Sequence, residues 1–503
     1  MCHINQNKGG MVLSLRESCG VFGAYSERCD VFPYLYWGML AQNHRGHQSY
    51  GFATLDGKIS CHTGLGLIPT SEEGKCANGL IGRIGIANVR YATSGPSDAD
   101  ALQRDAMPIV SSDGVRSIAV SFNGNIVNIR SLQRRIGAPS NYSDSYAISL
   151  LILKRLGETD SITEAARTCM REIDGSFSVT GFTDTGTLFA FKDSFGIKPL
   201  CYGCDEDVHA FSSESVGLDI NGLDLKHELR PGELITISDG EFCSEQVVRP
   251  KRKAFCAFEF AYFARPDSKF NGKYVYLARR DFGATLARTF HERASKCDVV
   301  VSLPETANDA AYGFHEESGL KWDMATRRHR YVSQRAFIID SGSREELLAR
   351  KMNILSDRIN GKRIAVVDDS IVRGDTTRIN VRRFRAAGAR EVHLFITFPR
   401  IIGPCFYGID MSTYRELIGA GLDPEEIAEE LDADSVNYLS IEDYVEATGL
   451  RRDELCLGCV TGEYPTPKAM DLSLEMRARL DEGKNESGRI YEQTSATSGC
   501  PSS

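Results

Sequence analysis

The chain of 503 residues is too long for a single hydrophobic core, so two domains with extensions are expected. Hydrophobic residues make up 42% and charged residues 25%, as in ordinary globular proteins, and the net charge of -9 argues against nucleic acid as a general partner. No apolar run is long enough to cross a bilayer and the first residues lack a signal-peptide core, so we expect a soluble cytoplasmic protein with no membrane partner.

The N-terminal half has the pattern of a sheet-rich α+β domain. Residues 1–18 are polar and without sustained periodicity, and we interpret them as a leader. From Cys19 to about Val248, short alternating or apolar stretches are separated by Gly, Asn, Ser and Asp, which predicts strands, for example over residues 19–25, 84–90 and 117–122. Residues 143–156 open with Ser-Asp-Ser and continue at helical spacing, which predicts a helix.

Four ordered motifs follow Cys19-Gly-Val-Phe-Gly in this half. In isolation, a Cys before Gly is most often a packed core thiol. The further motifs occupy residues 43–51, 89–95, 122–128 and 143–145. Together they resemble the class II glutamine amidotransferase domain, which has the N-terminal-nucleophile hydrolase fold.

The resemblance implies a role for each of five residues. Cys19 would be the nucleophile, with its free α-amine as the base, because amide hydrolysis needs a base beside the thiol. The Asn123 side chain and the Gly124 amide would form the oxyanion hole. Arg90 would bind the α-carboxylate of glutamine, and Asp144 its α-ammonium group.

This mechanism requires a free amine on Cys19, so we expect residues 1–18 to be a propeptide that is removed after Ser18. Two departures from the family pattern, His47-Gln48 and Phe122, affect the glutamine pocket without removing a named catalytic group. Gly at position 124 is expected to let the backbone approach the substrate closely.

The second half begins after a charged, Pro-containing segment, residues 249–253, which is predicted to be a linker. Uniformly apolar strands, over residues 298–303 and 363–367, then alternate with helices, over 376–387 and 424–431. This alternation predicts a doubly wound α/β domain from about 254 to 450. Beyond Tyr464 the chain is charged and then rich in Ser and Thr, and its last dozen residues are expected to be disordered.

The most informative segment of this half is residues 366–377, in which a buried strand leads into Asp368 and Asp369, a Gly-containing turn and two threonines. Ligands bind at such strand ends, and turn amides with a helix N-terminus can hold a phosphate. The alternative is an Asp pair that only caps the next helix. The spacing of an ATP-binding P-loop is absent from this segment.

The segment resembles the phosphoribosyl-pyrophosphate loop of type I phosphoribosyltransferases, in the form found in amidophosphoribosyltransferases. The resemblance assigns the phosphate to Arg373, Gly374, Asp375, Thr376 and Thr377. It assigns Mg²⁺ to Asp368 and Asp369, together with Thr306 of a second matching loop. Asp375 stands where these enzymes usually have Thr, and a carboxylate beside a phosphate is expected to lower substrate affinity.

A basic stretch from residue 330 to Lys351 resembles the family's loop that closes over the substrate, with Arg335 and Lys351 as its candidate contacts. It carries one extra residue near Ser333 relative to the usual pattern. An Arg- and Lys-rich loop that is merely solvated is the alternative.

The chain contains 15 cysteines, two of which form the pair Cys456-Leu-Gly-Cys459. Zinc, a redox dithiol and coincidence are all compatible with this pair alone. Residues 456–465, however, resemble the C-terminal signature of the iron–sulfur-containing amidophosphoribosyltransferases, and Cys256 and Cys405 stand in the matching contexts. The resemblance therefore implies a structural 4Fe–4S cluster on four thiolates.

The resemblance covers roughly residues 19–470 and implies one coupled reaction: glutamine is hydrolysed, and ammonia displaces pyrophosphate from phosphoribosyl pyrophosphate to give 5-phosphoribosylamine, the first step of purine synthesis. It also implies a homodimer or homotetramer inhibited by purine nucleotides. There are two alternatives. One is a paralogue with another acceptor or with glutaminase activity alone, and the other is a regulatory protein that senses phosphoribosyl pyrophosphate or nucleotides.

The expected division of the chain is a propeptide over 1–18, the amidotransferase domain over 19–250, the phosphoribosyltransferase domain over 251–450, and a cluster-binding segment with a disordered tail over 451–503.

Overall fold

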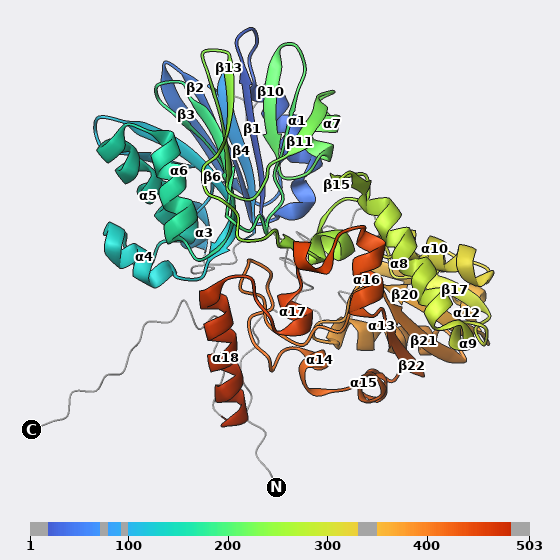
Figure 1. Cartoon of the computed structure of the whole chain (residues 1–503). Helices are drawn as coiled ribbons and strands as arrows, with labels where there is room; N and C mark the ends of the chain where they lie inside the picture. The colour runs from blue at the N-terminus through green and yellow to red at the C-terminus, as the bar shows by residue number, and fades with distance from the viewer. Residues whose placement is uncertain (1–18, 71–78, 92–98, 330–349, 484–503) are drawn as a thin grey trace, which may run out of the picture.

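The computed structural model describes residues 19–70, 79–91, 99–329 and 350–483, so the predicted propeptide lies outside the described residues. The N-terminal part is built on two antiparallel sheets (Figure 1). In spatial order, the first sheet contains β11 (Asp224–Glu228), β9 (Cys201–Cys204), β10 (Val208–Ser212), β1 (Gly20–Ser26), β4 (Ile84–Arg90), β2 (Ser49–Asp56) and β3 (Lys58–Leu65). The second contains β13 (Glu241–Gln246), β12 (Glu233–Ser238), β8 (Leu188–Lys192), β7 (Gly175–Thr183), β6 (Ser117–Ile126) and β5 (Ile109–Ser112).

Alternation of apolar side chains along the strands explains how these sheets stack. Val21 of β1 and Ala119 of β6 belong to one core between the two sheets. Phe22 points the other way, into a core shared with helix α1 (Phe32–Ala41). Ile118 likewise packs with the helices α5 (Asp144–Thr159) and α6 (Ile162–Glu172). The N-terminal part is therefore a helix–sheet–sheet–helix sandwich, the architecture that the class II glutamine amidotransferase resemblance implies.

The C-terminal part is a parallel sheet with helices on both faces. Its strands lie in the order β17 (Val299–Ser302), β20 (Arg363–Asp368), β21 (Glu391–Ile396) and β22 (Ser435–Tyr438). One face packs against α8 (Val275–Thr289), α10 (Asn308–Ser318) and α16 (Ile441–Thr448). The other packs against α12 (Ser356–Ile359), α13 (Asp375–Ala386) and α15 (Pro424–Leu431). Because both faces are covered, β17 and β20 carry consecutive buried apolar residues, as predicted for a type I phosphoribosyltransferase domain.

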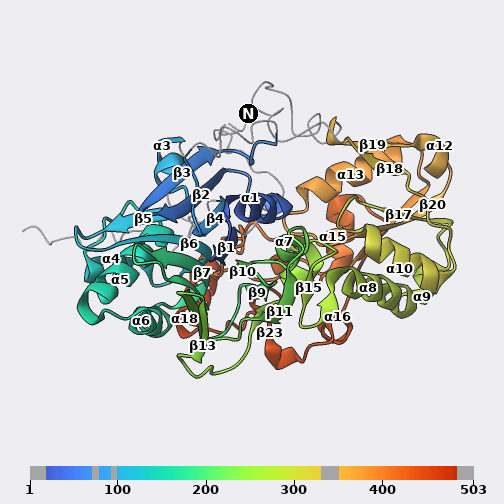
Figure 2. The same ribbon diagram turned by 90° about the horizontal axis from the view of Figure 1, so that it is seen from above.

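Most predicted elements are present, with small shifts at their ends. Strand β4 and helix α15 have the predicted bounds, whereas α5 runs on to Thr159. The predicted linker, residues 249–253, contains neither helix nor strand. The two parts lie side by side when the molecule is seen from above (Figure 2). Among the described residues, no helix combines the length and the apolar character needed to span a bilayer.

The described tail contains a helix that the sequence reading did not identify, α18 (Pro467–Asp481). Proline stands at its start, and Ala469, Leu472 and Met476 recur at spacings of three and four, so that one face is buried. The charged residues between them conceal this period. The last dozen residues, for which disorder is expected, lie outside the described ranges.

Candidate active sites

The predicted nucleophile, Cys19, is buried immediately before strand β1. Its thiol donates to the carbonyl oxygen of Tyr91 at 3.5 Å. Burial raises the pKa of this thiol, while the positive charge of Arg90 opposes the rise and the negative charge of Asp144 adds to it. The thiol is therefore protonated near neutral pH, and a nucleophilic role requires a separate base. The two predicted glutamine-binding charges lie close enough to Cys19 to influence it.

The backbone fixes both of these charged residues. Arg90 ends strand β4 and its carbonyl oxygen accepts a hydrogen bond from the Gln48 amide at 3.1 Å. Asp144 is the first residue of α5, and its carboxylate accepts from the amides of Ser145, at 3.0 Å, and Ile126, at 3.4 Å. Both side chains are almost fully buried. A helix N-terminus and a strand end thus hold opposite charges near the thiol.

The predicted oxyanion residues lie on β6. Asn123 is 1% exposed, and neither its amide nitrogen nor its amide oxygen has a hydrogen-bond partner in the described part of the chain. A buried amide without partners is costly, and a ligand that supplies them explains its presence. A Cβ on Gly124 would lie 1.9 Å from the carbonyl oxygen of Ser176 on β7. Glycine is therefore required here by the packing of β7, and not only by the approach of a substrate.

A loop of the C-terminal part docks on the same two strands. Asn125 donates to the carbonyl oxygen of Phe406 at 2.9 Å, and the Ser176 hydroxyl donates to that of Tyr407 at 3.0 Å. Gly408, at φ +95°, lies against the same strand, and a Cβ there would be in van der Waals contact, 3.4 Å, with the Gly124 carbonyl oxygen. The predicted oxyanion strand is thus in direct contact with the other half of the molecule.

The predicted magnesium-binding residues meet at the carboxyl end of β20. The Thr306 hydroxyl donates to one carboxylate oxygen of Asp369, and the Ser370 hydroxyl donates to the other at 2.7 Å. Burial raises the pKa of Asp369, and burial together with the neighbouring charge of Asp369 raises that of Asp368 well above its ordinary value. Asp369 is buried and Asp368 is half-buried, and two neighbouring carboxylates that disfavour joint ionisation are suited to a divalent cation, since Mg²⁺ prefers oxygen ligands.

The predicted phosphate loop leads into helix α13. Gly374 adopts φ +80° as the N-cap, and a Cβ there would meet Ile418 at 2.8 Å, which explains the glycine. Asp375, Thr376 and Thr377 form the first turn, where helix amides favour an anion. These residues adjoin the acidic pair, as the resemblance implies.

Arg373 is placed differently from the other loop residues. Its Nε donates to the Glu416 carboxylate at 2.8 Å, and its guanidinium also donates to the Asp410 carbonyl oxygen at 3.0 Å. Through these contacts, the Arg373 side chain connects the phosphate loop to the segment of Asp410 and Glu416. Its direct contact with a phosphate stays a prediction.

Of the predicted closing loop, only the base is described. Strands β18 (Thr326–Arg328) and β19 (Met352–Ile354) pair antiparallel and bring the two ends together. Burial and the nearby Arg328 lower the pKa of Lys351. Arg335 lies outside the described residues.

The four predicted cluster cysteines are neighbours in the fold. Strands β14 (Phe255–Cys256) and β23 (Leu455–Cys456) pair in parallel, with Cys256 opposite Cys456. The carbonyl oxygen of Cys459 accepts from the Ile402 and Gly403 amides, which brings in the segment of Cys405. Burial raises the pKa of Cys459 well above its ordinary value, and the charges of the other three thiols add to this rise.

Two observations bear on whether these thiols fit a cluster. Within the described ranges, no three His, Cys, Asp or Glu side chains stand close enough together to hold a metal ion, so the four thiols do not form a closed ligand set in this arrangement. The donors nevertheless fit chemically, because a set of four cysteine thiolates is typical of iron–sulfur clusters. The Tyr407 amide also donates to the Cys405 sulfur at 3.3 Å, a contact that stabilises a thiolate.

The sequence reading missed a buried ion network beside Cys19, formed by Arg45, Glu214 and Glu259. A signal was available, because Glu259 interrupts an apolar run and a buried acid requires a partner. Its partner, however, is 214 residues away along the chain and on the other half of the molecule.

Comparison with known proteins gives consistent matches. A family model described as a glutamine amidotransferase domain matches residues 97–219. An amidophosphoribosyltransferase of Methanocaldococcus jannaschii is 39% identical over 471 residues, which cover 89% of this chain and 98% of that protein. The Bacillus subtilis enzyme of the same name is 34% identical over 473 residues, which cover 92% of this chain and 97% of that protein.

Two solved structures match over nearly the whole chain. One is glutamine phosphoribosylpyrophosphate amidotransferase from Bacillus subtilis complexed with ADP and GMP, with a TM-score of 0.79 and 33% identity, covering 90% of this chain and 98% of that one. The other, described as the allosteric regulatory enzyme of purine biosynthesis, has a TM-score of 0.81 and 32% identity, covering 89% of this chain and 96% of that one.

Proposed function

The chain belongs to the amidophosphoribosyltransferase family, the enzymes of the first step of purine biosynthesis, and from that premise we propose which residues carry each half of the reaction. In that reaction, glutamine is hydrolysed to glutamate and ammonia. The ammonia then displaces pyrophosphate from C1 of phosphoribosyl pyrophosphate to give 5-phosphoribosylamine. We assign hydrolysis to the N-terminal part and transfer to the C-terminal part, with the boundary near residue 250.

The hydrolytic half rests on the surroundings of Cys19. A buried, protonated thiol needs a base, and the α-amine of a mature chain beginning at Cys19 takes the thiol proton. Arg90 pairs with the α-carboxylate of glutamine and Asp144 with its α-ammonium group. The Asn123 amide and the Gly124 N–H stabilise the oxyanion that forms when sulfur attacks the amide carbon. The partnerless Asn123 amide is the single observation that best supports this assignment.

The transfer half rests on the strand end at Asp368 and Asp369. These carboxylates, with Thr306, would hold Mg²⁺, which neutralises charge on the leaving pyrophosphate when bound. The first turn of α13, with Thr376 and Thr377, binds the 5′-phosphate through backbone amides and hydroxyls. We assign further contacts with the substrate to the closing loop, through its basic residues Lys351 and Arg335.

The proposal includes a 4Fe–4S cluster on Cys256, Cys405, Cys456 and Cys459. Its function is structural, since the reaction transfers a group and moves no electrons. It would tie the segment after the linker to the C-terminal segment, which β14 and β23 already bring together. A cytoplasmic location belongs to the same proposal, because a reducing compartment keeps the 12 described free cysteines as thiols. The proposal also includes inhibition by purine nucleotides, which the relative complexed with ADP and GMP supports, and a homo-oligomeric state, which the family resemblance implies.

The test uses protein purified anaerobically and sequenced at its N-terminus. Mature protein beginning at Cys19 should convert glutamine and phosphoribosyl pyrophosphate, with Mg²⁺, into equal amounts of glutamate and pyrophosphate. Glutamate without pyrophosphate would instead indicate another acceptor or glutaminase activity alone. Tight binding of phosphoribosyl pyrophosphate without turnover would indicate a sensing protein. Protein that retains residues 1–18 should form no glutamate, because the α-amine of Cys19 is then an amide.

A further inference from the structure

A fully buried arginine lies at the seam between the two halves of the molecule. Arg45 ends the short helix η1 (Asn43–Arg45), and its side chain has no exposed surface. Its guanidinium donates to the Glu214 carboxylate at 2.5 Å and to both oxygens of Glu259, at 2.7 and 3.0 Å. The third guanidinium nitrogen, Nε, donates to the carbonyl oxygen of Cys19 at 3.2 Å. One cation thus connects the nucleophile's backbone with two acidic residues.

The contact with the nucleophile includes packing as well as a hydrogen bond. A Cβ on Gly20 would lie 3.4 Å from Cδ of Arg45, so the Cys19-Gly20 backbone rests on the arginine side chain. The same loop also reaches the glutamine-binding residue, because a Cβ on Gly46 would lie 2.5 Å from the Arg90 amide nitrogen. Movement of Arg45 would therefore displace Cys19 relative to the oxyanion strand.

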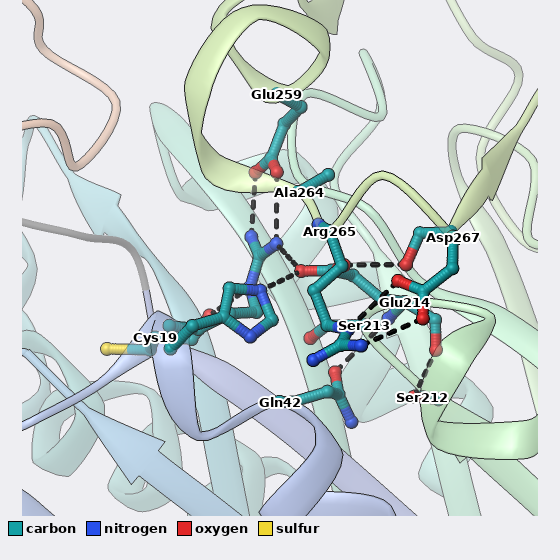
Figure 3. A network of polar contacts seen from close by, with 12 residues as sticks. Cys19, Gln42, Ser212, Ser213, Glu214, Glu259, Ala264, Arg265 and Asp267 are labelled. Atoms are coloured by element: carbon teal, nitrogen blue, oxygen red, sulfur yellow. Dashed lines mark hydrogen bonds and ion pairs between the residues drawn. The ribbon is translucent and has the colours of Figure 1, made fainter. Parts of the chain in front are cut away.

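The two acids that hold Arg45 come from different halves of the chain. Glu214 belongs to the N-terminal part, and its second carboxylate oxygen accepts from the Arg265 amide at 2.9 Å and the Ser268 hydroxyl at 2.6 Å. Glu259 is the first residue of η2 (Glu259–Phe263), after the linker. Figure 3 shows Glu259 above the network and Glu214 at its centre, with Cys19 to one side.

The short helix that carries Glu259 is itself fixed from the transfer site. Arg279 of α8 is buried, and it donates to the carbonyl oxygens of Phe260, at 2.9 Å, and Ala264, at 2.8 Å. The same positive charge opposes the rise that burial causes in the pKa of Asp369. A second link runs through Phe398, whose amide donates to the Asp369 carbonyl oxygen at 2.8 Å and whose ring packs edge-on against Phe258, 4.8 Å between centroids.

We propose that Glu259 of the transfer half, acting through Arg45, is a positioning residue for the glutaminase nucleophile Cys19. Neither side chain reacts. Glu259 sets the position of the Arg45 guanidinium, and the guanidinium sets the position of the Cys19 carbonyl. The Cys19 thiol is attached to the same residue, so its position is set as well. This role rests on the proposed function, in which Cys19 attacks glutamine, and it makes hydrolysis dependent on a residue outside the hydrolytic half.

The test replaces Glu259 by Gln in the mature full-length enzyme, which keeps the shape and removes the charge. The kcat for glutamine hydrolysis should fall by about tenfold to a hundredfold, as expected when a reacting group is displaced by about 1 Å. The KM for glutamine should change less than kcat, because the substitution removes no group assigned to glutamine binding, and ammonia-dependent formation of phosphoribosylamine should be unchanged. Glu259→Asp, which keeps the charge, should recover part of the lost kcat.

Glu316→Gln is the matched control, because Glu316 pairs with Arg280 on the surface of the same half. Both activities of this variant should equal those of the wild type. If Glu259→Gln lowers the glutamine- and ammonia-dependent rates equally, or leaves the glutamine kcat unchanged, the positioning role is wrong. Should that variant not fold, Glu259→Asp is measured alone, and an unchanged glutamine kcat again overturns the proposal.

The two proposals can fail separately. If the wild type forms no phosphoribosylamine from either nitrogen source, the proposed function is wrong. The positioning role is then judged from the rate at which an electrophilic glutamine analogue alkylates Cys19. That rate should be lower in Glu259→Gln than in the wild type and in Glu316→Gln, and equal rates contradict the role.

Discussion

Replacement of Asn123 by Leu should make the protein more stable and its glutaminase activity much weaker. The buried Asn123 amide has no partner among the described residues, and Leu has a similar shape without a polar group. A buried polar group without a partner costs about 1–3 kcal/mol, so its removal should raise the free energy of unfolding by up to that amount. For a domain of this size, each kcal/mol raises Tm by about 2–4 °C.

The activity should change in the opposite direction. Loss of one oxyanion-hole donor lowers kcat by about a hundredfold to a thousandfold in comparable sites, or about 2.7–4 kcal/mol of transition-state stabilisation. The glutamine kcat would be measured by glutamate release, and Tm by calorimetry without substrate. Ammonia-dependent transfer, which bypasses the oxyanion hole, should remain and shows that the C-terminal part is intact.

Asn125→Leu is the control, because Asn125 lies two residues further along β6 and is equally buried. Its amide nitrogen donates to the Phe406 carbonyl oxygen, although its amide oxygen has no partner among the described residues, so the same substitution should here lower the free energy of unfolding, by up to about 1–3 kcal/mol. If Asn123→Leu destabilises the protein as much as Asn125→Leu does, or retains full glutaminase activity, Asn123 is an ordinary core residue and the oxyanion assignment is wrong.

Three further outcomes are expected. Asp375→Thr should lower the KM for phosphoribosyl pyrophosphate about fivefold, since removing one like charge near the phosphate is worth about 1 kcal/mol. An unchanged KM in steady-state assays would mean that the Asp375 carboxylate points away from the phosphate. Cys405→Ser should abolish the iron–sulfur absorbance of anaerobically purified protein and loosen the C-terminal segment to proteolysis, whereas Cys243→Ser, at an exposed thiol, should alter neither. Because the pKa of the Cys19 thiol is raised, the pH dependence of the rate should follow the α-amine instead. The kcat/KM for glutamine should rise with pH through about 7.7–8.0, as the amine loses its proton, and a rate that is flat from about pH 6.5 to about 9 would count against the amine as base.

Much of the fold follows from local pattern. Helix α15 could be bounded because Asp423 and Glu426 form a capping box and Pro424 occupies the first turn. Strand β4 was equally clear, because it is mostly apolar up to Arg90. Helix α18 was missed since only one narrow face of it is buried and many of its other positions are charged. The periodicity of apolar residues alone does not distinguish such a helix from a polar tail.

The site residues were identified by motif, whereas the network that supports them was not. Arg45 stands inside a recognised motif, yet its partners lie far away in the sequence, one in each half. No periodicity links residues at that separation, and only the fold brings them together. The motif explains Gly124 by the approach of a substrate. The steric contact with β7, which leaves no room for a Cβ at this position, depends on strand pairing that a single sequence does not reveal.

The docking of residues 406–408 on strands β6 and β7 has a consequence for how this protein can vary. The N-terminal strands contribute side chains, those of Asn125 and Ser176, whereas the loop accepts these two hydrogen bonds through carbonyl oxygens. Every residue type has a carbonyl, so the two acceptors themselves do not depend on side-chain polarity, although the buried rings of Phe406 and Tyr407 keep the loop in place. A deletion or insertion shifts them out of register, and a side chain at Gly408 is strained at φ +95°. Homologous transferase domains should therefore be exchangeable across this seam when they keep the loop length, the glycine and large buried side chains at positions 406 and 407.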